Sequence, residues 1–165
     1  MKRFLAIGVL ALCLVSSQFA RADEACDAKI KTEIVENYFL LRDAIKIKDP
    51  ERLISFESPD YTEVRVSGAV ANKQQADDAW REMVKLIKTV YEVRVEFKKL
   101  TVEPHRVVVL NNQFLDADIA TPDGVLHRVS ATIRQRDIWV EYDRVWMLKR
   151  SELINRQFIV NGKPE

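Results

Sequence analysis

The sequence predicts an α+β domain in which three N-terminal helices pack on a strongly curved antiparallel β-sheet and form a cone with an internal pocket. Apolar residues recur at helical spacing until about Ile87 and then alternate with a period of two from Val90 onward. Four long alternating segments follow one another with short turns between them. Helices that precede a run of antiparallel strands are typical of α+β domains. A break in the alternation at Lys98-Lys99 predicts a β-bulge, which bends a sheet.

The first 22 residues have the features of a cleavable secretory signal peptide. Lys2 and Arg3 are followed by an apolar run over 4–15 and by the small-residue cleavage site Ala20-Arg21-Ala22. We therefore expect the mature protein to begin at Asp23 and to be periplasmic or secreted. Because the apolar run is shorter than the roughly 20 residues that span a bilayer, we expect no stable membrane insertion after cleavage.

The mature chain has the length of one domain. We expect this domain to cover 23–160 and a loose tail to cover 161–165. Three basic residues leave with the signal peptide, so the formal net charge changes from +1 to −2. A near-neutral chain with interspersed signs has no electrostatic footprint for nucleic acid, and we expect no such partner.

The composition offers little to a metal or a cofactor. Cys26 is the only cysteine of the mature chain, so it is either an incidental free thiol or a bridge between two chains. Two separated histidines, His105 and His127, and one terminal cysteine do not make the ligand set of a zinc site. The sequence contains no glycine-rich phosphate loop. We therefore predict neither a metal nor a cofactor.

Each predicted helix has a local signal. A first helix over 27–46 carries an apolar stripe of Ile30, Ile34, Tyr38, Leu41 and Ile45. Asp49-Pro50-Glu51 supplies an N-cap, a first-turn proline and a first-turn acid for a second, short helix. Ser58-Pro59-Asp60 ends it, and a short strand over 61–66 follows. Asn72 with Gln75 resembles a capping box and predicts a third helix that ends near Ile87.

Four long strands are predicted over 90–104, 106–120, 125–142 and 145–155. Thr121-Pro122-Asp123-Gly124 is a strong hairpin turn between the second and the third. Asp143-Arg144 predicts a tight turn before the last strand, although no glycine supports it.

Four stretches, taken in order, resemble a known superfamily. They are Ala44–Asp49 leading into Leu53–Phe56, Tyr61–Val64 before Gly68, Pro122–Gly124, and Arg136–Val140 followed by Val145–Leu148. Their order and spacing are similar to those of the nuclear transport factor 2-like superfamily, the cystatin-like cone folds, and most similar to its polyketide cyclase-like and uncharacterised bacterial secreted members. The resemblance implies a cone with an internal cavity and often a homodimer formed through the outer sheet face. It does not imply one activity.

Six aromatic residues on predicted element faces are the candidates for a ligand pocket: Tyr38, Tyr61, Trp80, Tyr91, Phe114 and Trp139. Large rings around a cone can bind an apolar or aromatic ligand, or they can fill the core. Asp137 shares the face of Trp139. If it is buried, it needs a partner such as Arg134, Arg144 or a hydroxyl group.

Catalysis would need a positioned acid–base group. The resemblance places a steroid isomerase-like base just before Gly68, where this chain has Arg65, and an ion pair with Arg65 would keep the nearby Glu63 ionised and weakly basic. His127 alternates in phase with apolar residues and is expected to face inward, with an aspartate such as Asp137 as its candidate partner.

Three hypotheses for function follow. The first is an exported pocket protein that binds a small, largely apolar molecule. The second is a lyase or isomerase that acts on a small apolar substrate through a His127–Asp137 pair. The third is an interaction module that docks another protein through its open sheet face.

Overall fold

The computed structural model describes the backbone of residues 5–121 and 123–164 and the side chains of residues 25–121 and 123–164. The first helix, α1 (Leu5–Ile47), buries Ile34, Tyr38 and Ala44 on the face that the apolar stripe predicts. The predicted signal peptide and its cleavage site, at 1–22, lie outside the residues whose side chains are described. Among the residues described, no helix is both long and apolar enough to cross a membrane.

The two later helices begin where their capping residues predict. The side chain of Asp49 accepts a hydrogen bond from the backbone of Arg52 at the start of α2 (Pro50–Ile54). Helix α3 (Lys73–Leu86) begins with a full capping box, in which Asn72 and Gln75 each bond the backbone N–H of the other at 3.0 Å.

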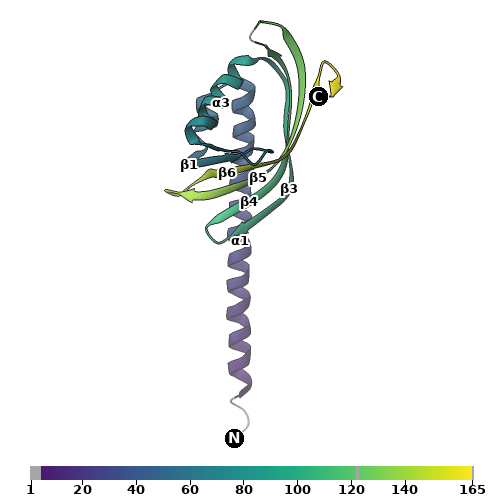
Figure 1. The fold of residues 1–165 in the computed structure, drawn as a ribbon. Helices are drawn as coiled ribbons and strands as arrows, with labels where there is room; N and C mark the ends of the chain where they lie inside the picture. Colours follow the sequence, from purple (N-terminus) through teal and green to yellow (C-terminus); the bar gives the residue numbers. More distant parts are fainter. Residues whose placement is uncertain (1–4, 122, 165) are drawn as a thin grey trace.

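The strands form one strongly curved sheet that wraps around α1 and α3 (Figure 1). Its order is β2 (Val70–Asn72), β1 (Glu57–Val64), β6 (Val145–Val160), β5 (Leu126–Tyr142), β4 (Arg106–Ala120) and β3 (Ile87–Glu103), with the short β7 (Lys163–Pro164) paired to β6. The α+β class, the curvature and the four long antiparallel strands are confirmed.

Strand β1 differs from its prediction in two ways. It begins at Glu57 instead of Tyr61, and it runs parallel to β6, so the sheet is mixed. The early start has a local cause, because the residue before a proline is pushed to extended conformations. Ser58-Pro59 therefore ends the helical region and lies inside the strand that follows it.

Residues 161–164 of the predicted loose tail form a turn and the short strand β7. Asn161 donates its backbone N–H to the carbonyl of Arg128 at 2.8 Å, and its side-chain oxygen accepts the backbone N–H of Arg128 at 3.0 Å. A turn with left-handed backbone at Asn161 and Gly162 then lets β7 pair with the end of β6. Residues 163 and 164 therefore belong to the sheet.

Bulges in β3 decide which side chains face the interior. The predicted register shift at Lys98 is present, and two further shifts lie near Lys88 and Tyr91. The shift near Tyr91 turns this side chain to the outer face of the sheet. There Tyr91 is 52% exposed, and its hydroxyl donates to Asp118 at 2.6 Å. The prediction of Tyr91 as a pocket residue is therefore wrong, because a one-residue shift moves a side chain across the sheet.

The core fills only part of the cone. Trp139, Val107 and Val109 on the inner sheet face pack against Ile34 and Tyr38 of α1, and all five side chains are almost completely buried. The inner-face side chains farther along β4 and β5 border a cavity instead of a helix.

Candidate functional site

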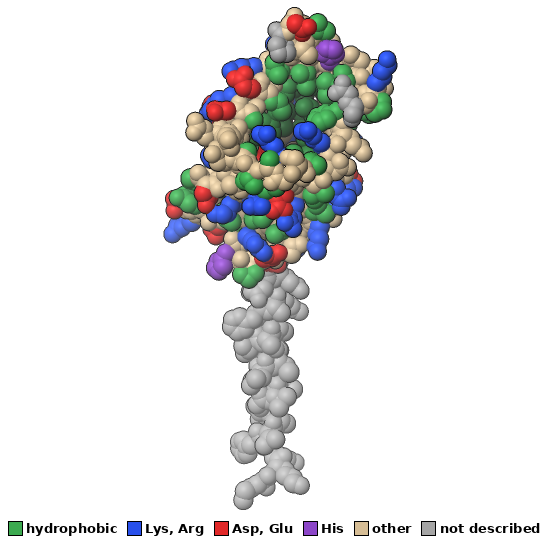
Figure 2. Space-filling model, viewed as in Figure 1, with side chains coloured by type: hydrophobic (Ala, Val, Ile, Leu, Met, Phe, Trp, Pro, Cys, Tyr) green, Lys and Arg blue, Asp and Glu red, His purple; other side chains and the backbone are tan. Residues whose placement is uncertain are grey.

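A cavity of about 430 Å³ lies between the inner sheet face and the three helices. In Figure 2 it is visible as a hollow lined by hydrophobic side chains. Most of its wall is apolar, with side chains from every helix and from five strands, among them Leu41, Leu53, Met83, Leu115, Val129 and Phe158. This size and this wall are typical of small-molecule sites.

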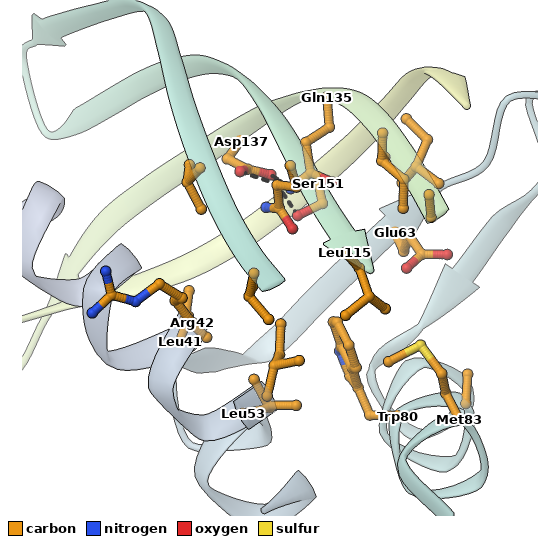
Figure 3. A pocket seen from close by; sticks show the side chains of 18 of the residues that line it. Leu41, Arg42, Leu53, Glu63, Trp80, Met83, Leu115, Gln135, Asp137 and Ser151 are labelled. Atoms are coloured by element: carbon orange, nitrogen blue, oxygen red, sulfur yellow. Dashed lines mark hydrogen bonds between the residues drawn. The ribbon is translucent and has the colours of Figure 1, made fainter. Parts of the chain in front are cut away.

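Four of the six aromatic residues that the sequence singles out have atoms at the cavity wall: Tyr38, Tyr61, Trp80 and Phe114. Tyr38 of α1, Tyr61 of β1 and Trp80 of α3 face the cavity from three different elements. Trp80 lies beside Leu115 and Met83 in Figure 3. The period of each element therefore indicated the correct face for these three residues.

The rings of Trp139 and Phe114 do not face the cavity. Trp139 is completely buried behind Tyr38, and its indole N–H donates to the Tyr38 hydroxyl at 3.2 Å. Phe114 belongs to a strand of the cavity wall, but its ring is on the outer face, where the Arg94 guanidinium lies 5.1 Å from its centre. Trp139 is thus a core residue, and Phe114 does not present its ring to the cavity.

Asp137 is the centre of a hydrogen-bond network at the floor of the cavity (Figure 3). Its carboxyl accepts from Tyr38 Oη at 2.6 Å, Ser151 Oγ at 2.7 Å, Asn111 Nδ2 at 2.8 Å and Gln135 Nε2 at 2.9 Å. Burial raises the pKa of Asp137 above its ordinary value, and the hydrogen bonds oppose that shift. Among the partners predicted for a buried Asp137, the hydroxyl group is the one present.

The Tyr38 hydroxyl is fully engaged inside this network. Besides donating to Asp137, it accepts from Trp139 Nε1 and from Asn111 Nδ2, each at 3.2 Å. Burial and the neighbouring carboxyl of Asp137 raise the pKa of Tyr38 well above its ordinary value. The hydroxyl therefore stays protonated and fixes the floor.

Glu57 is a cavity residue that the sequence did not reveal. It is 5% exposed, and its carboxyl accepts from Trp80 Nε1 at 3.0 Å and from Lys73 Nζ at 2.9 Å. Burial raises the pKa of Glu57 to about 7, although the Lys73 ammonium opposes the shift. The sequence signal for Glu57 was weak, because Glu57 precedes Ser58-Pro59, where a helix was expected to end. Glu57 joins the cavity wall because β1 begins before the proline.

Glu63 also faces the cavity from β1. The predicted ion pair with Arg65 is loose, since Arg65 Nε lies 3.8 Å from the nearest carboxylate oxygen. Burial raises the pKa of Glu63, whereas the charge of Arg65 lowers it. The pKa of Glu63 is raised overall, whereas the ion pair was expected to keep it low.

His127 and Asp137 do not come together. They lie ten residues apart on β5, a separation on the order of 30 Å along a strand. His127 Nδ1 is 3.0 Å from Asn161 Nδ2, near the C-terminal turn. The predicted pair is therefore not formed. No cluster of three or more potential ligands able to hold a metal occurs in the part of the chain that the structure describes.

A curved sheet closed by helices around a ligand-sized cavity defines a cone-shaped pocket protein. No protein-family model matches the sequence, and no curated protein matches it. Solved structures do match: the chain has the nuclear transport factor 2-like fold.

Three of these structures illustrate the match. An NTF2-like protein from Cytophaga hutchinsonii is 18% identical, with a TM-score of 0.59 over 74% of this chain and 95% of that one. A proposed dehydratase of the NTF2-like family from Streptomyces avermitilis is 12% identical, with a TM-score of 0.57 over 78% and 95%. A proposed calcium/calmodulin-dependent protein kinase II association domain from Xanthomonas campestris is 14% identical, with a TM-score of 0.52 over 73% and 84%. At these identities the likeness shows the fold and leaves the activity open.

Proposed function

We propose that this protein binds a small, largely apolar molecule in the cavity of its cone. The cavity itself carries the proposal: about 430 Å³ of space has a wall made mostly of aliphatic and aromatic side chains. Transfer of apolar surface from water into such a wall is favourable by about 25 cal/mol per Å². The Asp137 network holds the floor in place, so the site is formed before a ligand arrives.

A variant that fills the cavity tests this function. Leu115→Trp places an indole ring in the cavity, and we expect it to weaken binding of the fluorescent apolar probe N-phenyl-1-naphthylamine at least tenfold. Val145→Trp, at the exposed start of β6, is the control and should leave binding unchanged. Equal binding by both variants, measured by fluorescence titration, would place the probe outside the cavity and contradict the proposal.

We also propose that the protein is exported. The support is the basic start, the apolar run over 4–15 and the Ala20-Arg21-Ala22 site. N-terminal sequencing of the protein recovered from outside the cytoplasm should begin at Asp23. Recovery of a chain that still begins at Met1 would contradict cleavage.

A homodimer formed through the outer sheet face is the arrangement that we propose for the exported protein. Half-buried apolar side chains of Val108, Leu110, Phe114 and Ile138 lie on that face. One structurally similar protein is named as an association domain. Native mass spectrometry should record twice the chain mass, and a monomer at micromolar concentration would count against this arrangement.

A further inference from the structure

Three carboxyl groups, those of Glu57, Glu63 and Asp137, lie on the cavity wall. The Glu63 carboxylate receives no hydrogen bond from the residues that the structure describes, and its nearest cation, Arg65, lies 3.8 Å away with a largely exposed side chain. A ligand with N–H or O–H groups would supply the donors that this half-buried carboxylate lacks.

The charges around the cavity also favour a cation. Burial raises the pKa of Tyr61 most, and the carboxyls of Glu57, Asp137 and Glu63 raise it further, so three acids act on this hydroxyl. Three cations lie near these acids: Lys73 offsets the charge of Glu57, Arg65 lies loosely beside Glu63, and Arg42 is engaged by another acid.

Arg42, which lines the cavity, is bound to Asp43 at 3.0 Å and lies over the Phe39 ring. Lys73 pairs with both Glu57 and Asp77. Of the three acids, Glu63 therefore has the weakest partner, and in a partly shielded site its carboxylate attracts a cation more strongly than it would at the surface.

Aromatic rings lie beside these carboxyls. Tyr61 is 3% exposed and lines the cavity together with Trp80, whose indole is fixed by its hydrogen bond to Glu57. The faces of such rings attract ammonium groups. In Figure 3, Glu63 is seen between the polar floor at Ser151 and the apolar side chains of Leu115 and Met83.

We propose that the cavity selects a hydrophobic amine, with its ammonium group bound by the Glu63 carboxylate beside Tyr61 and its hydrocarbon part packed against Met83 and Leu115. This inference rests on the proposed function, because it names the chemical class of the ligand for the same cavity. The ammonium supplies the hydrogen-bond donors that Glu63 lacks, and the apolar part replaces water along the rest of the wall.

Three probes of equal size and different charge test this selectivity. Isothermal titration at pH 7.5 would compare 4-phenylbutylamine, 4-phenyl-1-butanol and 4-phenylbutyrate. We expect the amine to bind at least tenfold more tightly than the alcohol and the carboxylate to bind most weakly. In Glu63→Gln the preference for the amine over the alcohol should fall to about twofold or less. Glu92→Gln, on the exposed outer face of β3, is the matched control and should keep the full preference.

The outcomes separate this inference from the function on which it rests. If the alcohol binds as tightly as the amine, or the carboxylate binds best, the amine selectivity is overturned and the pocket function stands. If none of the three probes binds but N-phenyl-1-naphthylamine does, the amine selectivity is overturned and the pocket function still stands. If no probe of either kind binds, both proposals fail. The comparison in the unchanged protein does not depend on a variant, so it holds even if Glu63→Gln is unstable.

Discussion

Replacing Asp137 with alanine is expected to lower the free energy of unfolding by about 3–5 kcal/mol. The substitution removes the acceptor for Tyr38, Ser151, Asn111 and Gln135 at once. Each buried donor that loses its partner costs about 1–3 kcal/mol, and water entering from the cavity offsets part of the sum. Urea denaturation followed by circular dichroism measures the loss.

The exposed end of the same strand provides the control for Asp137. Glu141→Gln also removes a carboxylate from β5, but at a surface position, and it should change stability by less than about 0.5 kcal/mol. The stability loss of Asp137→Asn should lie between those of Asp137→Ala and Glu141→Gln. The asparagine amide keeps one accepting oxygen, but it turns an N–H group toward side chains that are themselves donors. A loss below about 1 kcal/mol for Asp137→Ala would mean that the network does not support the floor.

The second large effect is a loss of stability as the pH rises from about 4.5 to about 7. Burial raises the pKa of Glu57 from 4.5 to about 7, so in this window the folded protein holds a proton that the unfolded chain has released. The proton stabilises the folded state fully below pH 4.5, and this contribution is lost as the pH passes 7. It amounts to at most about 3 kcal/mol.

Glu57→Gln should reduce the slope of the pH profile in this window, and Glu63 and Asp137, whose pKa values burial also raises, account for the slope that stays. The amide cannot ionise, yet it keeps an oxygen that can accept from Trp80. Urea unfolding at four pH values between 4.5 and 7.5 would compare this variant with the unchanged protein and with Glu141→Gln. Acids with lowered pKa values, such as Asp116 and Glu152, act below this window, because their stabilisation is lost only on acidification. Parallel profiles for all three proteins would exclude Glu57 as the cause.

Features set by neighbouring residues could be predicted from the sequence. The cap at Asn72 and Gln75, the proline start of α2 and the bulge at Lys98 each depend on a few adjacent side chains, and all three are present. The order of the four long strands follows for the same reason, because each connects to the next by a short turn. Even the turn at Asp143-Arg144 forms without glycine, with both residues in left-handed conformations.

Features set by distant pairing could not be predicted. Periodicity tells which face a side chain occupies but not how far along the strand a partner lies, so it suggested a pair between His127 and Asp137. Periodicity also assigns the wrong face where a β-bulge that the sequence does not reveal shifts the alternation of side chains, as at Tyr91. Glu57 entered the cavity through the parallel pairing of β1 with β6, which no local pattern specifies.

That parallel pairing also orders the events of folding. Strands β3 to β6 can pair through successive hairpins, whereas β1 must close a loop of most of the domain before Glu57 lies beside Leu148. The antiparallel meander should therefore form first and β1 dock last. Because β1 carries Glu57, Tyr61 and Glu63, the polar side of the cavity is then completed only in the final step. A chain that emerges N-terminus first would complete this cavity only after its C-terminal strands had emerged.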